Sequence, residues 1–161
     1  METHVTNWKS NLAILLLALS SAGCDLEPVS IEVFPALLMN PQIEPPAKWR
    51  QVEFEGSVRS PGGTYLVGPE RLISDWNITA FRPSPQPDGS YAVNVRLNEF
   101  ARRKMAAFSA NTANLKKPVA VNVNGRWTDF VPILGPVGDR FTMFGLTESE
   151  VEGLQHQLET R

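Results

Sequence analysis

The chain has 161 residues, with 15 Lys and Arg against 17 Asp and Glu, so its formal net charge is −2. This charge removes the electrostatic basis for binding nucleic acid or an anionic membrane surface. Apolar residues make up 42% and charged residues 20%, a globular composition that excludes a disordered chain, and the single cysteine excludes an internal disulfide.

Residues 1–23 have the pattern of a secretory signal peptide. A weakly positive start that holds Lys9 precedes an unbroken apolar run at 12–19, and small residues follow at 20–23. Eight helical residues span about 12 Å, whereas the hydrocarbon core of a bilayer is about 30 Å thick. We therefore predict a cleaved leader and not a transmembrane anchor. A buried core helix is the alternative interpretation.

Ala22-Gly23-Cys24 resembles the lipobox of bacterial lipoproteins, although Ser21 stands where that family prefers leucine. The resemblance implies that the Cys24 thiol is acylated and anchors the mature chain on the periplasmic side of a membrane. Asp25, directly after it, favours the inner membrane in the same comparison. Ordinary cleavage near Ala22, which would leave a free thiol, is the competing interpretation.

Residues 24–48 are predicted to form a lipidated, proline-rich tether, and residues 49–161 to form one domain. Proline fixes φ and has no N–H to donate, so this stretch cannot be a continuous helix or inner strand. The run 30–34 is still able to pair as an edge strand. The prolines of the tether are Pro28, Pro35, Pro41, Pro45 and Pro46.

Alternating apolar residues predict strands within 51–56, 65–67, 78–81, 91–97, 119–123, 126–133 and 141–144. In the sixth, Trp127, Asp129 and Val131 are expected on one face. Asp88-Gly89 and Asn124-Gly125 predict hairpins, because these pairs adopt positive φ at low cost.

Two helices are predicted between and after these strands. Asn98 caps the first, and Pro118 stops it. A capping box at 147–150 begins the second, which runs to residue 158. The order strands, helix, strands, helix predicts an α+β domain with a mainly antiparallel sheet and two helices packed on one face. The buried stripe of the first helix is expected at Ala101, Met105, Phe108, Thr112 and Leu115.

The mature chain offers little catalytic chemistry. His156 is its only histidine and Cys24 its only cysteine, so neither a zinc site nor a nucleophilic triad is expected. Glu148, Glu150 and Glu152 lie in the first turns of a predicted helix, where carboxylates stabilise the helix dipole. No phosphate-binding or dinucleotide-binding loop occurs. We predict no enzyme activity, metal, cofactor or small-molecule substrate; a hydrolase that uses acidic residues is a distant alternative.

Two groups of residues are candidates for binding a partner. Arg102, Arg103 and Lys104, with Lys116 and Lys117, form a basic patch, which is either a solvated helix face or a docking patch for an acidic partner or lipid head groups; Arg102 and Arg103 are the candidate contacts. Arg126 and Trp127 follow a hairpin turn, and both residue types dominate binding hot spots; the alternative for Trp127 is the core. A strand edge near Tyr65 or Pro132 is expected to accept an extended segment by main-chain pairing.

The region 65–158 resembles the head subdomain of the first periplasmic domain of SecD and SecDF protein-export subunits. The resemblance implies a SecD-like fold, contact with exported polypeptide and no catalytic residues. Those subunits also have transmembrane helices that use the proton gradient, and this chain has no apolar run of about 20 residues. We therefore expect an envelope lipoprotein with a non-catalytic protein-binding domain that assists export; the alternative is a structural or adaptor lipoprotein of an envelope complex. The matching stretches are 65–67, 72–80, 91–97, 111–114, 117–127 and 141–150.

Overall fold

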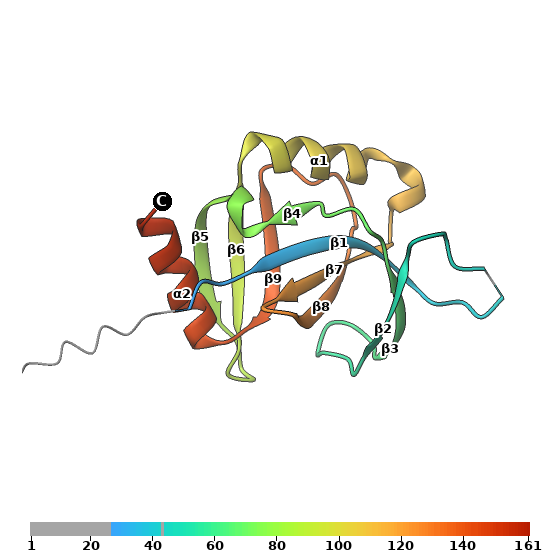
Figure 1. Cartoon of the computed structure of the whole chain (residues 1–161), viewed down its shortest axis with the longest axis horizontal. Coiled ribbons are helices and arrows are strands. Elements are labelled where there is room, and N and C mark those ends of the chain that lie inside the picture. The colour runs from blue at the N-terminus through green and yellow to red at the C-terminus, as the bar shows by residue number, and fades with distance from the viewer. Residues whose placement is uncertain (1–26, 43) are drawn as a thin grey trace, which may run out of the picture.

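The computed structural model describes residues 27–42 and 44–161; the predicted leader and Cys24 lie outside the described residues. The described chain is an α+β domain, which confirms the predicted class (Figure 1). The strands are β1 (Ile31–Leu38), β2 (Arg50–Phe54), β3 (Gly63–Val67), β4 (Ile73–Ser74), β5 (Ile78–Pro85), β6 (Tyr91–Leu97), β7 (Pro118–Val123), β8 (Arg126–Pro132) and β9 (Arg140–Leu146). The helices are α1 (Glu99–Ala110) and α2 (Glu148–Glu159).

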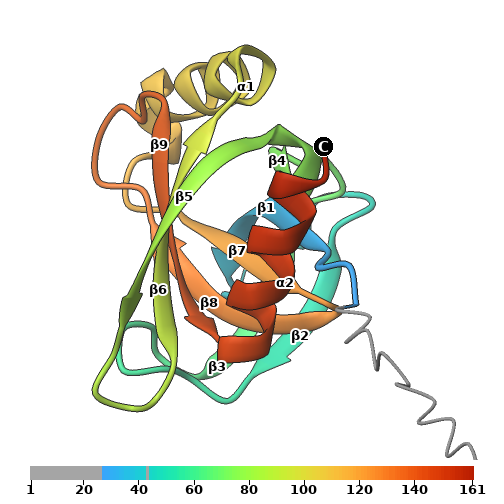
Figure 2. The same ribbon diagram turned by 90° about the vertical axis from the view of Figure 1, so that its left-hand side faces the viewer.

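The strands form two sheets, and all of their recorded pairs are antiparallel. The larger sheet has the order β2-β3-β1-β7-β8, with β4 paired to β1, and the smaller has the order β5-β6-β9. In Figure 2 the smaller sheet stands at the left, α2 lies across the front and α1 lies at the top.

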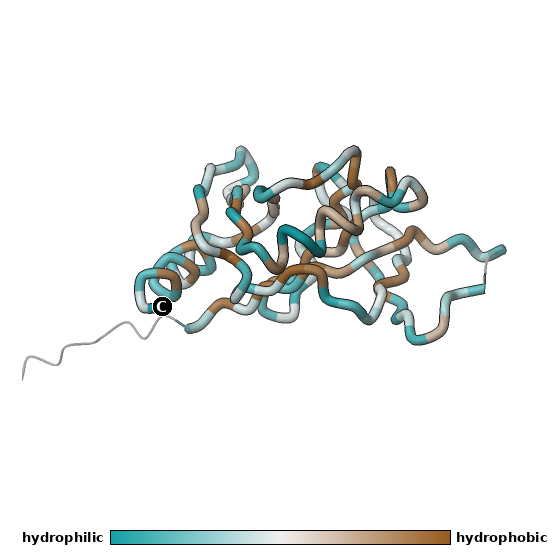
Figure 3. Tube along the Cα trace, turned by 90° about the horizontal axis from the view of Figure 1, so that it is seen from above, coloured by the Kyte–Doolittle hydropathy of each residue, from teal (hydrophilic) through white to brown (hydrophobic). Residues whose placement is uncertain are grey.

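One main core joins the two sheets and both helices. Strands β1, β6, β7 and β9 contribute fully buried side chains, and the helices add Met105 and Leu154. Hydrophobic segments accordingly gather towards the middle of the molecule, while hydrophilic ones prevail in the loop at its right-hand end (Figure 3). A second cluster lies on the other side of the larger sheet and is mostly aromatic, with Phe34, Tyr65 and Phe130 at its centre.

The predicted caps and the second hairpin are confirmed. The Asn98 side chain accepts the Ala101 N–H, and Thr147 and Glu150 form the capping box of α2. Asn124 and Gly125 both have positive φ, 51° and 83°, and join β7 to β8. Helix α1 is shorter than predicted, because the chain leaves the helical conformation after Ala110.

The predicted tether over residues 24–48 is wrong for residues 29–38. Strand β1 lies in the interior of the larger sheet, between β7 on one side and β3 and β4 on the other, and Val33 is fully buried. Pro35 is tolerated there because it lies where the neighbour of β1 changes from β4 to β3. Its C=O accepts the Gly68 N–H, and no strand requires its missing donor. Val29 already packs in the core, so the domain includes this residue and extends well before the predicted boundary at residue 49.

No helix in the described part of the chain is both long and apolar enough to cross a membrane.

Candidate functional site

Arg126, predicted as a binding residue, joins three elements of the fold. Its guanidinium donates to both carboxylate oxygens of Glu150, at 3.0 and 2.8 Å, and to the C=O of Gly145 at 3.2 Å. Glu150 is buried and also caps α2. The first residue of β8 therefore holds the N-terminus of α2 against the end of β9. A partner could bind Arg126 only by sharing or breaking this ion pair.

Trp127 is half-buried in the aromatic cluster. Its ring lies edge-on to Phe34 at 6.2 Å and tilted against Phe130 at 6.1 Å. The Arg50 guanidinium lies 4.9 Å from the Trp127 ring centre, within cation–π range. The prediction that Trp127, Asp129 and Val131 share a face fails at a bulge: Val121 pairs with Asp129 but Asn122 with Trp127. The extra residue puts Trp127 in the same cluster as Phe130.

Arg102 and Arg103 are exposed on α1 and share one carboxylate. Both side chains donate to Glu99, at 2.7 to 2.8 Å. Hydrogen bonds from the two arginines lower the Glu99 pKa to about 2. Helix α1 lies above the sheets in Figure 1, whereas Arg126 and Trp127 begin β8 below it, so the fold does not gather the four predicted residues into one site.

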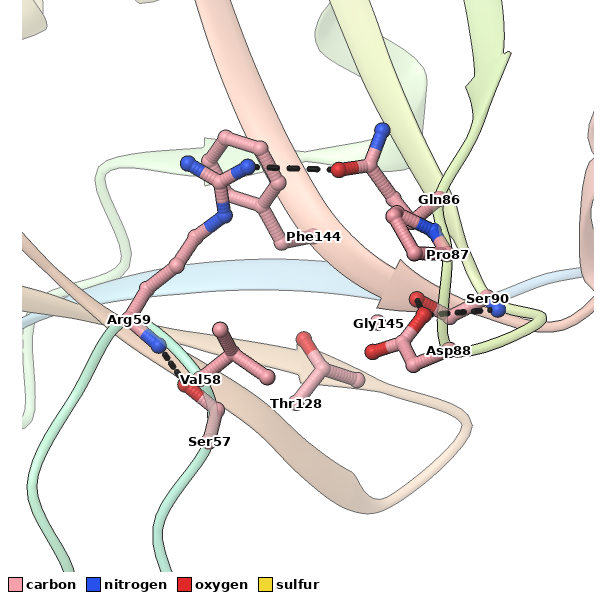
Figure 4. A pocket seen from close by; sticks show the side chains of 10 residues that line it. All are labelled: Ser57, Val58, Arg59, Gln86, Pro87, Asp88, Ser90, Thr128, Phe144 and Gly145. Atoms are coloured by element: carbon pink, nitrogen blue, oxygen red, sulfur yellow. Dashed lines mark hydrogen bonds between the residues drawn. The ribbon is translucent and has the colours of Figure 1, made fainter.

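A cleft of about 430 Å³ lies between the β2–β3 loop, the β5–β6 turn and the end of β9. Arg59 extends across Phe144, 3.7 Å from the ring centre, and donates to Gln86 at 3.2 Å (Figure 4). On the other wall, the Ser90 hydroxyl and N–H both donate to Asp88 and hold the pKa of that carboxyl below its usual value. Because these polar groups hydrogen-bond to one another, the cleft offers a surface for packing contacts more than a set of free polar groups for a ligand.

Asp129 is a buried carboxylate that sequence analysis did not single out. Its Oδ1 accepts the hydroxyls of Ser57 and Ser60 and the N–H of Phe130. Ser60 also donates to the C=O of Phe130 at 2.7 Å. The β2–β3 loop is thereby fastened along the outer edge of β8. Burial, and secondarily the charge of Asp129, raise the pKa of Tyr65.

Of the two predicted edge positions, the one near Pro132 lies on a sheet edge and the one near Tyr65 does not. Tyr65 lies on β3, which is paired with β1 on one side and β2 on the other, so the prediction of an edge there is wrong. Strand β8 is a sheet edge, but its outward groups are already used. The Phe130 C=O accepts the Ser60 hydroxyl of the loop and the Phe130 N–H donates to Asp129, while Pro132 has no N–H to offer.

The outer face of the smaller sheet carries a row of arginines that sequence analysis also missed. Arg82, Arg96 and Arg140 come from three different strands and surround one shallow hollow. Arg96 and Arg140 are direct cross-strand partners, an arrangement that like charges destabilise. The alternation of Arg96 with buried Val95 and Leu97 was visible in the sequence, but the pairing of the three strands was not.

The described residues hold no group of three or more His, Cys, Asp or Glu placed to bind a metal ion. His156 is exposed on α2. Glu148 and Glu152 are also exposed, and Glu150 is engaged with Arg126 and the capping box.

No family model and no curated protein matches this chain. Among solved structures, the chain is similar to one described as a membrane component, SecDF, that enhances protein export. The TM-score is 0.54 and the identity 15%, covering 90% of this chain and 71% of that chain. A structure of SecDF in its super-membrane-facing form gives a TM-score of 0.47 and 14% identity, covering 79% of this chain and 18% of that chain.

The fold thus defines the class of protein: an α+β domain with mainly antiparallel sheets and two helices. Within that class, the fold is SecD-like, as the similarity over 90% of the chain shows.

Proposed function

We propose that this chain is the protein-binding domain of a cell-envelope lipoprotein that assists protein export. The observation that carries the proposal is the SecD-like fold over 90% of the chain, shared with a component described as enhancing protein export. The corresponding part of that component, in this proposal, is the head subdomain of its first periplasmic domain. The partner is an exported polypeptide.

Two buried carboxylates support a non-catalytic role. Asp129 fastens a loop to β8, and Glu150 caps α2 and binds Arg126. A catalytic carboxylate must reach the substrate, whereas these two are turned to hydrogen-bond donors of the protein itself. The exposed positions Arg102 and Arg103, together with the half-buried Trp127, are the contact positions in this proposal.

The proposed lipid on Cys24 would hold the domain close to the membrane. Val29 packs on α2 and donates its N–H to Gln157 at 3.0 Å. Four residues lie between Cys24 and Val29, and the five steps from one to the other span at most about 18 Å when the chain is fully extended. The end of the domain that carries α2 then faces the bilayer, and the free surfaces of α1 and β9 are accessible from the periplasm.

Metabolic labelling tests the anchor. Cells that express the full chain are fed an alkyne fatty acid, and the purified protein is probed for the label. We expect labelling of the wild type and none of Cys24→Ser, with the variant released from the membrane fraction. Unlabelled wild-type protein would contradict the proposed acylation.

Photo-cross-linking in cells tests the partner. Photoreactive residues replace Arg102, Trp127 and Arg140, and the exposed Glu53 on β2 serves as a control position. We expect the first three to capture precursors of exported proteins more strongly than the control, and the capture to fall when secretion is blocked. Capture of folded envelope proteins alone would contradict the export role and favour the adaptor lipoprotein.

A further inference from the structure

The main-chain groups along one edge of β9 are free to pair. Strand β9 is the last strand of the smaller sheet and pairs only with β6. The Leu97 N–H donates to the C=O of Asp139 at 2.7 Å, which fixes the phase of the antiparallel ladder. Because such ladders alternate, the N–H and C=O groups of Arg140 and Thr142 point away from β6. Within the described residues, neither residue's main chain has a recorded partner on that side.

The other sheet edges are protected. The β2–β3 loop covers β8, as described above. Strand β5 has Pro83 and Pro85, which offer no donors, and β2 is short and carries Arg50 and Glu53. Prolines, charges and short strands are the usual means by which proteins prevent an edge from pairing. Residues 140–142 of β9 contain no proline, and although β8 and the segment 131–138 run beside them, neither makes a main-chain hydrogen bond to Arg140 or Thr142.

A hollow whose lining residues are mostly apolar, but which also exposes polar groups, runs beside this free edge. It has a volume of about 280 Å³ and lies between β9 and the segment 131–138. Leu134 on that segment is 80% exposed. The Val137 N–H donates to the buried Ser109 hydroxyl at 2.8 Å, which ties the segment to α1. The hollow is therefore held open by the fold, and an extended chain laid along β9 would place side chains in it.

Arg140 borders both this hollow and the row of arginines on the outer face of the smaller sheet, and that outer face is positive. Arg96 binds Asp139 at 3.3 Å, but no described carboxylate lies within ion-pair distance of its cross-strand partner Arg140 or of Arg82. An acidic side chain placed over Arg140 would relieve the repulsion between Arg96 and Arg140. The charge thus selects an acidic group on this face.

We propose that the β9 edge at Arg140–Phe144 binds an extended segment of another polypeptide as an added strand. Its side chains alternate, with apolar residues in the hollow beside Leu134 and acidic residues over Arg140. This inference rests on the proposed function, in which the domain binds exported chains, and it names the class of segment that binds. Main-chain pairing supplies affinity, and the alternation supplies selectivity.

Peptide binding to the full chain in detergent tests this inference. Three fluorescent octapeptides are compared. The first alternates apolar with acidic residues, and the second alternates apolar with basic residues. The third has the sequence of the first but is N-methylated at every second residue. We expect the first peptide to bind at least about tenfold more tightly than either of the others, because the loss of even one main-chain hydrogen bond or one charge contact corresponds to about a tenfold change in Kd. Equal binding of the N-methylated peptide would overturn the proposal.

Variants of β9 test the same point from the protein side. Thr142→Pro removes the outward N–H without removing a ladder hydrogen bond, and we expect about a tenfold loss, whereas Thr142→Ala keeps the N–H and changes Kd less than about twofold. Arg140→Glu should reverse the charge preference, while the matched change Arg82→Glu, two strands away, should not. If circular dichroism shows that both variants are folded, equal peptide binding by Thr142→Pro and Thr142→Ala would refute pairing at the β9 edge. If the proline variant does not fold, the result with the N-methylated peptide decides.

Two further outcomes overturn this inference specifically. A concentration-dependent dimer that Thr142→Pro abolishes would assign the edge to a second copy of this chain. Failure of all peptides, while the probes at Arg102 and Trp127 still capture exported precursors in cells, would reject the β9 edge and leave the proposed function standing. Failure of both experiments would reject both.

Discussion

Replacing Gly153 by alanine tests whether residues 27–30 belong to the domain. Gly153 lies in the middle of α2, and a Cβ built there would lie 2.7 Å from Cγ2 of Val29 and 3.1 Å from the C=O oxygen of Glu27. Neither atom moves away easily, because one is the branch of a buried side chain and the other is main chain. The substitution therefore forces the segment before β1 away from α2.

Two opposing contributions set the magnitude. Alanine is favoured over glycine in a helix interior by about 1 kcal/mol. Overpacking costs about 1–3 kcal/mol, and the main-chain contact favours the upper half of that range. The net result is a loss of about 1–2 kcal/mol in the free energy of unfolding, or a fall in Tm of about 4–8 °C for a domain of this size.

Thermal unfolding of the full chain, followed by circular dichroism, is the assay. Gly135→Ala is the matched control, because nothing lies within 4 Å of its added Cβ; it should leave stability within about 0.5 kcal/mol. In a Val29→Ala background, Gly153→Ala should cost at least about 1 kcal/mol less than in the wild type. A Gly153→Ala variant as stable as the wild type, or an equal loss in both backgrounds, would refute the packing of Val29 on α2.

Other predictions concern the β2–β3 loop, helix α1, Tyr65 on β3 and Gly145 near the end of β9. Asp129→Ala should lower the free energy of unfolding by about 2–3 kcal/mol and speed proteolysis within residues 55–62, because the β2–β3 loop loses its charged hydrogen-bond acceptor. Asp129→Asn should lower the free energy of unfolding by about half as much. Equal losses for the two variants would contradict the role of the charge. By NMR titration, the Glu99 carboxyl should have a midpoint near 2. Since that pKa is depressed in the folded state, its stabilising contribution is present above the ordinary value of 4.5 and disappears as the pH falls towards 2; a midpoint near 4.5 would show that its arginine contacts do not persist in solution. The pKa of Tyr65 is raised in the folded state, so its effect on stability has the opposite pH dependence: the free energy of unfolding should fall as the pH rises above 10. Tyr65→Phe should remove that decline. Gly145→Ala should destabilise the fold by about 1–3 kcal/mol, because φ is +79° and a Cβ would lie 3.3 Å from a main-chain oxygen of Thr128; Gly89→Ala, also at positive φ but in open space, should cost less.

Local patterns sufficed where neighbouring residues decide the structure. The Asn124-Gly125 turn, the Asn98 cap and the capping box of Thr147 are settled within three or four residues of chain, and the structure has all three. The α+β class followed from the order of these elements. The sequence also supplied the resemblance to SecD, and the fold is SecD-like.

Two errors came from applying local rules where distant segments decide. Proline normally excludes an inner strand, yet Pro35 lies inside β1 because two different strands meet there and neither needs its N–H. Alternation normally assigns strand faces, yet a bulge in β8 puts Trp127 in the same cluster as Phe130.

The candidate binding surface depended most on tertiary structure. Arg126 is exposed, as an anchor would be, but the fold places Glu150 against it, so its charge is already paired. Arg82, Arg96 and Arg140 are far apart in the sequence and form one positive face only when β5, β6 and β9 pair. The sequence by itself determined the α+β class, most of the element types, and the turns and caps, because these depend on residue patterns and short-range hydrogen bonding. Only the tertiary structure decided where the domain begins, which edge is open and which charges are already neutralised, because these depend on which distant segments come into contact.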